Sequence, residues 1–214
     1  CGDISETSLG ILSAKFDNSP LIETFVLNGK DLSDYNDGTF DFVATYSVLH
    51  HLPDYISIIK EFIRVLKPGG VVYIDHEVSP NYWVLDADYM EYLTELGENF
   101  RTYHLHELGL SESQGSMYKS IKNQIWNFKI FFKRKFFVDK SAEFLHEGDI
   151  HTNRYDYIKW DRIRKALDSN RSCDKVIEKD YLLCREDGDD PKIWKKWQNK
   201  CVDMRYIIAR KKRM

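Results

Sequence analysis

The sequence predicts an α/β fold built on a doubly wound, mostly parallel sheet. Three observations predict it. Residues 40–74 form a strand, helix, turn and strand pattern, a helix and short β-prone runs precede this unit, and the chain ends as helix, strand, helix and strand. Two buried strands joined through a helix are parallel, so residues 40–74 set the direction of the sheet.

The first elements are short. Asp3 stands at an expected strand end, and Ser5 is an N-cap for a helix of about three turns. The apolar face of this helix consists of Leu9, Ile11, Leu12 and Phe16. Pro20 helps to break the helix, and a short β-prone run at residues 22–27 leads into a turn.

The central unit is the clearest part of the pattern. Its first apolar run lies between Gly38 and Pro53 and predicts a buried strand of roughly 5 to 7 residues. Pro53 suits the first turn of the following helix. The apolar positions of that helix are Ile56, Ile59, Phe62, Ile63 and Leu66. Residues 67–70 (KPGG) then end the helix and turn the chain into a strand at 71–74.

After Glu77 the alternation is interrupted. We expect one helix from Ser79 to Leu96 and a second over about residues 114–138, with no strand between them. These helices predict a cap inserted into the fold. Alternation returns with elements at 155–167, 176–184, 191–197 and 203–209, and the last strand can run antiparallel at one sheet edge. The predicted organisation is a cofactor-binding part at 1–78, a helical cap at 79–153 and the rest of the core at 154–214.

Composition restricts the class of protein. The chain of 214 residues is 43% hydrophobic, enough for a substantial core, and its net charge of -3 gives no general reason to expect nucleic acid. The four cysteines have neither zinc-site spacing nor the density of a disulfide scaffold, which favours a reducing cytoplasm. No apolar run approaches the roughly 18 residues that suggest a membrane span.

Three motifs occur in order: DGTFDFV at 37–43, VLHHL at 48–52 and RVLKPGG at 64–70. In this series they resemble the class I S-adenosylmethionine-dependent methyltransferases that act on small molecules. The likeness is close over about residues 2–78. It implies a Rossmann-like sheet with an antiparallel last strand, a cap after the fifth strand, and S-adenosylmethionine as the cofactor.

The resemblance also implies contacts to the nucleoside of the cofactor. Asp3, with Ile4 beside it, corresponds to the acidic residue that accepts from the ribose hydroxyls. Asp31, with Leu32 beside it, corresponds to the acidic residue that accepts from the adenine amino group. The alternatives are an acid that favours a helix N-terminus for Asp3 and a turn aspartate for Asp31.

The methionine part of the cofactor is expected nearer the centre of the sheet. Tyr46, Ser47 and His50 correspond to positions on this side, while His51 is expected to pack structurally. The chain opens with Cys1 and without the first strand and glycine-rich loop of the family. We therefore expect that upstream sequence is missing and that this chain binds the cofactor weakly or not at all.

Residues for the transfer step are sought near the same sheet edge. Because the donor methyl is intrinsically reactive, the enzyme mainly aligns the acceptor and removes a proton. The candidate catalytic groups are His76, Glu77 and His151, the last in a polar segment at 144–151, and each can also be an ordinary polar residue. No ligand triad has a recognisable spacing, so no metal is expected.

The cap carries the candidates for substrate recognition. Tyr82 and Trp83 suit a ring-bearing or sugar-like acceptor, although core packing explains them equally well. The segment 126–137 is basic and aromatic, and the net charge between Lys119 and Lys140 is +6. The segment is expected first to form a lid over the substrate. Contact with an anionic membrane surface is the second alternative, and contact with RNA is the third.

With this resemblance, the sequence predicts a cytoplasmic enzyme that transfers a methyl group from S-adenosylmethionine to a small-molecule acceptor, and we expect that acceptor to be a hydroxyl. Two alternatives remain open: a catalytically inactive partner protein, and a membrane-surface methyltransferase with a lipid-linked or saccharide substrate. A dehydrogenase is disfavoured, because its Tyr-x-x-x-Lys spacing occurs twice, at Tyr118 and at Tyr155, and neither follows the expected strand.

Overall fold

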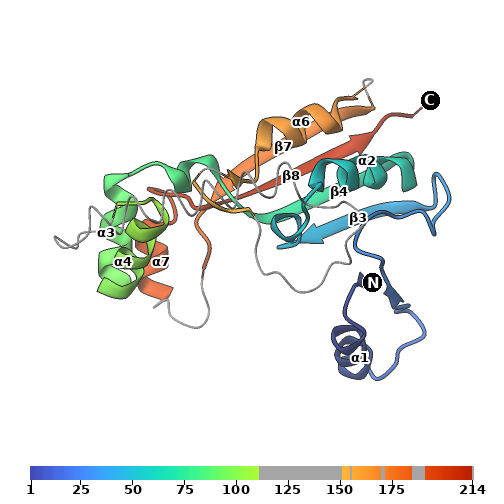
Figure 1. Cartoon of the computed structure of the whole chain (residues 1–214), viewed down its shortest axis with the longest axis horizontal. Helices are drawn as coiled ribbons and strands as arrows, with labels where there is room; N and C mark the ends of the chain where they lie inside the picture. The colour runs from blue at the N-terminus through green and yellow to red at the C-terminus, as the bar shows by residue number, and fades with distance from the viewer. Residues whose placement is uncertain (111–150, 155, 170–171, 185–190, 214) are drawn as a thin grey trace, which may run out of the picture.

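The computed structural model describes residues 1–110, 151–154, 156–169, 172–184 and 191–213. Its principal sheet has the strand order β3-β4-β8-β7 (Figure 1). These strands are β3 (Phe40–Tyr46), β4 (Leu66–Val78), β7 (Cys173–Tyr181) and β8 (Met204–Lys211). β3 and β4 are parallel, and β8 runs antiparallel to both β4 and β7. The predicted α/β sheet with an antiparallel last strand is confirmed.

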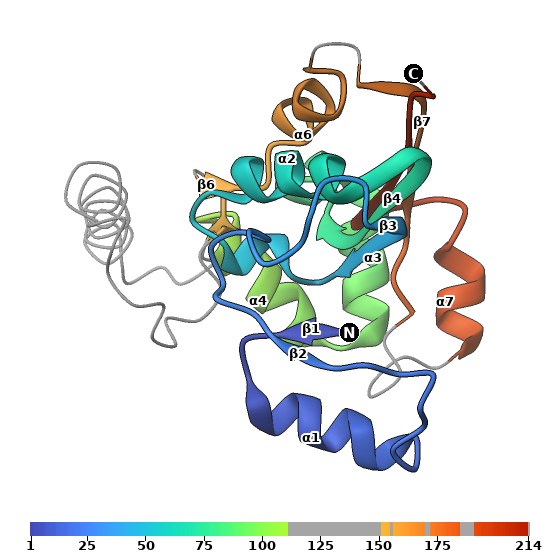
Figure 2. The same ribbon diagram turned by 90° about the vertical axis from the view of Figure 1, so that its right-hand side faces the viewer.

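A second, small sheet stands at the start of the chain. β1 (Gly2–Asp3) and β2 (Phe25–Val26) pair in parallel with each other, separately from the principal sheet. Helix α1 (Glu6–Lys15) lies beneath them in Figure 2, and the Ser5 side chain accepts a hydrogen bond from the Ser8 N–H at 3.2 Å. The predicted N-cap at Ser5 is confirmed. Only two residues of the β-prone run at 22–27 form a strand.

The central unit forms as predicted, with shifted boundaries. Its helix α2 (Tyr55–Val65) begins after Asp54, whose carboxylate accepts from the Ser57 N–H at 3.1 Å. The prediction that Pro53 occupies the first turn is therefore wrong, because the side chain of Asp54 caps the helix. Residues 67–70 lie inside β4 at a shift of register, where Gly69 has a φ of +83°.

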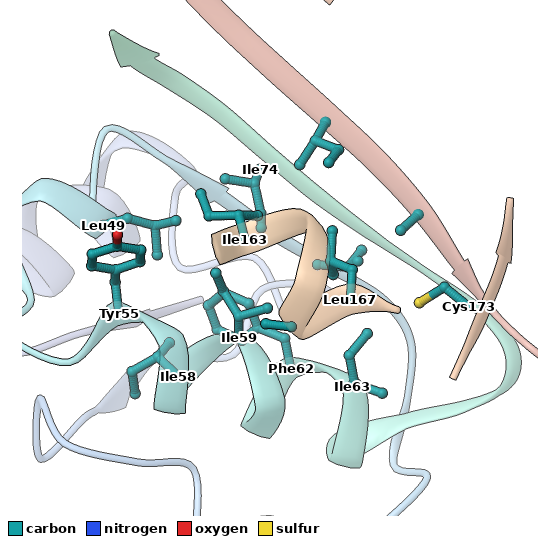
Figure 3. Packing of buried hydrophobic residues seen from close by; sticks show 14 of the residues in the cluster. Leu49, Tyr55, Ile58, Ile59, Phe62, Ile63, Ile74, Ile163, Leu167 and Cys173 are labelled. Carbon is teal, nitrogen blue, oxygen red and sulfur yellow. The ribbon is translucent and has the colours of Figure 1, made fainter. Parts of the chain in front are cut away.

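One face of the principal sheet carries the core. Helices α2 and α6 (Trp160–Leu167) pack together over it, and Figure 3 shows their apolar side chains meeting those of β4. Ile59, Ile163 and Ile74 are fully buried. The helix predicted from residue 155 begins only at Trp160, because the short strands β5 (Thr152–Asn153) and β6 (Asp156–Tyr157) form a hairpin before it.

The opposite face of the sheet is open at several apolar side chains. Phe42 and Tyr46 on β3 are 56% and 58% exposed, and Ile177 on β7 is 55% exposed. Side chains alternate between the faces of a strand, so only every second residue of β3 faces α2 and α6. The prediction that this strand is buried is therefore wrong for one of its faces.

The expected single helix from residue 79 to 96 is also wrong. A 3-10 turn, η2 (Pro80–Trp83), is followed by α3 (Ala87–Leu96), because the Asp86 carboxylate accepts from the Tyr89 N–H at 2.8 Å and starts a new helix. α4 (Glu98–Glu107) was not predicted, and α7 (Pro191–Trp197) begins at its proline as expected. These helices gather beyond one end of the sheet (Figure 1).

Several predictions fall on other parts of the chain. The helix expected at 114–138 and the basic segment at 126–137 lie outside the described residues. Within the described ranges, no helix combines the length and the apolar character needed to cross a membrane. All four cysteines are free thiols.

We predict that Ile163→Ala lowers the free energy of unfolding by about 2 to 5 kcal/mol, because it leaves a cavity between α2, α6 and the sheet. Ile11→Ala is the matched control, since Ile11 is 66% exposed, and its effect should stay within about 0.5 kcal/mol. Urea unfolding followed by circular dichroism measures both. Equal losses in the two variants would contradict this view of the core.

Candidate functional site

The carboxyl ends of the parallel strands β3 and β4 meet at one edge of the sheet. There Ser47 and His76 adopt left-handed backbone conformations, with φ of +57° and +61°, and the Ser47 N–H donates to the Asp75 carbonyl at 3.0 Å. Such conformations at residues other than glycine cost about 1–3 kcal/mol and gather at functional sites. Open α/β sheets also bind ligands beyond their carboxyl ends. This edge is the candidate site.

Glu77 fixes the loop that follows β3. Its side chain is only 1% exposed, and its Oε1 accepts from the backbone N–H groups of Val48 at 3.2 Å and Leu49 at 2.7 Å. Its Oε2 lies 2.8 Å from His50 Nδ1. A buried carboxylate needs such partners to offset its loss of hydration. The side chain of Glu77 thereby connects the end of β4 to the 3-10 turn η1 (Leu49–His51).

A second carboxylate, Asp75, holds His76 in place. Asp75 Oδ1 accepts from the His76 N–H at 2.6 Å and from the Tyr181 hydroxyl at 2.7 Å, and Oδ2 accepts from the Tyr73 hydroxyl. Burial and these bonds to Asp75 raise the pKa of Tyr73 to about 12, and they raise the pKa of Tyr181 as well. Both phenols therefore remain protonated donors at neutral pH.

This network was not found from the sequence. Tyr73 and Asp75 alternate with apolar residues along β4, which is a detectable signal for a polar face. Tyr181 lies 106 residues further along the chain, and only the pairing of β7 with β8 brings it to Asp75.

The ring of His76 lies at the same edge. It stacks on Tyr46 with the ring centroids 4.4 Å apart, and its Nδ1 is buried without a hydrogen-bond partner among the described residues. Burial lowers the pKa of His76 against the opposing effect of Asp75 and Glu77, so the neutral ring is favoured. Tyr46, Ser47, His50, His76 and Glu77, all named from the sequence, are thus brought together.

His151 reaches this edge from a distant part of the chain. Its backbone N–H donates to the His50 carbonyl at 3.1 Å. Its buried ring places Nδ1 2.8 Å from Asp156 Oδ1 and Nε2 3.1 Å from the Leu52 carbonyl. Both ring nitrogens therefore face acceptors, which favours a role in holding the segment after residue 150 against η1.

Asp3 and Ile4 stand at the end of the small sheet formed by β1 and β2. Asp3 is exposed, and its Oδ1 accepts from the Ser5 N–H at 2.8 Å at the start of α1. Ile4 is 50% exposed. Asp3 thus makes the contact expected of an acidic residue at a helix N-terminus. Its carboxylate also remains accessible at the carboxyl end of a parallel strand.

Asp31 lies in a tight turn. Its Oδ1 accepts from the Ser33 hydroxyl at 2.6 Å, from the Asn28 amide at 2.9 Å and from the Ser33 N–H at 3.0 Å. These hydrogen bonds, led by the Ser33 hydroxyl, lower the pKa of Asp31 to about 2. The turn-aspartate alternative is thus realised at Oδ1. The Leu32 N–H donates to Glu61 at 3.3 Å, and its side chain packs on the core.

The two cap residues named from the sequence differ in their surroundings. Tyr82 lines a pocket of about 410 Å³ between α3 and α4, and its hydroxyl donates to Glu107. Trp83 is 6% exposed and packs against Tyr157, with the ring centroids 5.3 Å apart. The other lining residues of the pocket are Tyr89, Leu93, Asn99, Phe100, Tyr103 and His104. Across the described residues, no group of three or more His, Cys, Asp or Glu side chains is placed to hold a metal ion.

Comparison with known proteins finds a family match in the first part of the chain. Residues 1–74 match a family model described as a methyltransferase domain. The chain is 35% identical over 91 residues to a demethylmenaquinone methyltransferase of Halalkalibacterium halodurans, a match covering 42% of this chain and 37% of that protein. It is 34% identical over 115 residues to the protein of the same name from Lysinibacillus sphaericus, covering 52% and 49%.

A solved structure extends the likeness to the whole fold. A SAM-dependent methyltransferase of Methanosarcina mazei matches with a TM-score of 0.51 and 19% identity, covering 100% of this chain and 81% of that one. At this identity the likeness concerns the fold alone. The chain spans less than half the length of the two curated relatives.

We predict that Ser33→Ala raises the pKa of Asp31 toward its ordinary value of 3.8, because the Ser33 hydroxyl makes the largest contribution to its lowering. A depressed folded-state pKa stabilises the protein above the unfolded-state value, and this stability is lost as pH falls toward about 2. The variant should therefore lose less stability than the wild type between about pH 4 and pH 2.

Carboxyl carbon chemical shifts measured against pH follow Asp31 directly. Ser57→Ala is the matched control, because it removes the equivalent serine hydroxyl from Asp54. It should leave the titration of Asp31 unchanged. A Ser33→Ala titration identical to that of the wild type would show that this hydroxyl does not hold the Asp31 carboxylate.

Proposed function

We propose, on the premise that residues 1–74 belong to the class I S-adenosylmethionine-dependent methyltransferases, that this chain is part of an enzyme that transfers a methyl group from S-adenosylmethionine to a small-molecule acceptor. The observation that carries the proposal is the pair of left-handed residues, Ser47 and His76, at the carboxyl ends of β3 and β4. They lie within or next to the matched segment. Their conformation is the kind that binding sites maintain.

The residues present fit the nucleoside part of the cofactor. The accessible Asp3 carboxylate offers an acceptor for vicinal hydroxyls, and Ile4 beside it offers apolar surface. Asp31 uses Oδ1 within its turn, so Oδ2 is the oxygen proposed to accept from the adenine amino group, with Leu32 next to it. Tyr46 and Ser47 are proposed to line the methionine side.

When bound, S-adenosylmethionine supplies a methyl group already activated on a sulfonium. The chain then has to orient the acceptor and remove a proton if the acceptor is a hydroxyl, which we propose. His76, Glu77 and His151 were the candidates for the proton acceptor. The contacts of Glu77 and His151 favour positioning roles, and the enclosed Nδ1 of His76 faces no acceptor or donor among the described residues.

The acceptor is proposed to be an apolar, ring-bearing molecule. The pocket between α3 and α4 is lined mainly by aromatic side chains, among them Tyr82, and begins one short turn after β4 ends. Flat rings stack well on such surfaces. The curated relatives are named for methyl transfer to demethylmenaquinone, an acceptor of this kind. Residues 79–153 are then proposed as the part that selects the acceptor.

We predict that Asp3→Ala raises the dissociation constant for S-adenosylhomocysteine by roughly 10- to 100-fold, because hydrogen bonds to a charged group contribute about 1.5–3 kcal/mol. Asp34→Ala, which removes an exposed carboxylate from the loop before β3, should leave the constant unchanged. Isothermal titration calorimetry at high protein concentration measures both. Equal dissociation constants for Asp3→Ala and Asp34→Ala would contradict the proposed contact of Asp3 with the ribose hydroxyls.

The transfer itself is tested with radiolabelled S-adenosylmethionine and the reduced form of demethylmenaquinone. The proposed function requires labelled acceptor that is extracted with the lipid-soluble products. Label that appears only on a soluble hydroxylated acceptor would keep the methyl transfer and exclude the apolar acceptor. No labelled product from either acceptor would count against the enzyme.

A further inference from the structure

We propose that His50, oriented by Glu77, takes the proton that the acceptor loses during methyl transfer. The inference rests on the proposed function and gives a chemical role to a residue otherwise expected only to line the cofactor. It is carried by one juxtaposition at the sheet edge, where a carboxylate that is 1% exposed lies 2.8 Å from His50 Nδ1.

The hydrogen bond selects the tautomer of His50. An ionised carboxylate only accepts hydrogen bonds, so the Nδ1 that faces Glu77 Oε2 carries the hydrogen. In the neutral ring the lone pair is then on Nε2. A carboxylate that fixes a histidine in this way is the arrangement by which hydrolases and metal sites prepare the second ring nitrogen for its task.

Glu77 is itself held rigidly. Its Oε1 accepts two backbone N–H groups from the same loop that carries His50, so the carboxylate and the imidazole are fixed to one local frame. This arrangement costs no reorganisation when the ring becomes charged. The adjacent negative charge also stabilises the imidazolium that proton transfer produces.

The position of His50 suits a proton acceptor. It lies in η1, three residues after Ser47, and its side chain is 16% exposed, so the ring is largely desolvated but reachable. Among the described residues, the ionisable groups near it include Glu77 and His76 from β4, His51 with ring centroids 4.2 Å away, and His151, whose backbone N–H donates to the His50 carbonyl.

The transfer step balances with these groups alone. An oxygen lone pair of the acceptor forms the new bond to the methyl carbon, while the carbon–sulfur bond breaks and its electron pair remains on the sulfur of S-adenosylhomocysteine. The hydroxyl proton moves to His50 Nε2. The positive charge lost from sulfur thus reappears on the imidazolium beside Glu77, and the proton passes to water after the product leaves.

The decisive measurement is the tautomer of His50. In protein labelled with nitrogen-15 at histidine, two-bond correlations should show hydrogen on Nδ1 and a bare Nε2 in the neutral ring. In Glu77→Gln the amide can donate to Nδ1, which should move the hydrogen to Nε2. Hydrogen on Nε2 in the wild type overturns the inference, so the result does not depend on the folding of the variant.

Asp156→Asn is the matched control, because His151 and Asp156 form a second histidine–carboxylate contact at the same 2.8 Å. It should alter the His151 signals and leave those of His50 unchanged. A change in the His50 tautomer in this variant would show that the tautomer is not set by Glu77 and would count against the inference.

Kinetics separates a chemical role from a structural one. His50→Gln should lower kcat by about 100- to 10,000-fold, a much larger factor than any rise in the dissociation constant for S-adenosylhomocysteine that follows from its place beside the cofactor. A proportional loss of cofactor binding would overturn the assignment as base. Absence of methyl transfer in the wild type overturns the proposed function instead, whichever tautomer His50 adopts, so the two failures are distinguishable.

Discussion

The buried carboxylate of Glu77 ties the end of β4 to the loop after β3, and the rest of the candidate site depends on that contact. Without this carboxylate, the buried Leu49 N–H and the partly buried Val48 N–H at the start of η1 would lose their acceptor. With the carboxylate in place, the side chains after β3 are held in one arrangement. Asp75 does the same for His76 from the neighbouring position of the strand.

The sheet edge gains its rigidity from the core beneath it. α2 and α6 bury one face of β3 and β4, so the strand ends cannot shift independently of the packed apolar layer. Tyr181 adds a tie across the sheet, from β7 to Asp75 on β4. Strained conformations at Ser47 and His76 persist because hydrogen bonds and packing over-determine their surroundings.

Much of the fold could be predicted from local signals. The N-cap at Ser5 and the start of α7 at Pro191 depend on residues that are close in sequence. The alternation of strand and helix in residues 40–74 also depends on local sequence. The predicted helix starts were wrong where an aspartate further along the chain caps the helix. The carboxylates of Asp54 and Asp86 accept backbone hydrogen bonds, so α2 and α3 start later than expected. The open face of β3 could not be predicted, because exposure depends on which faces other elements cover.

The sequence by itself determined the parallel βαβ unit, because that unit follows from spacing along the chain, and the resemblance to a methyltransferase family named five of the residues that meet at the sheet edge. Only the tertiary structure decided what those residues do for one another. The pairing of Glu77 with His50 spans 27 residues and that of Asp75 with Tyr181 spans 106. Such contacts are set by strand register and sheet order, since hydrogen bonds act over about 3 Å whatever the separation in sequence.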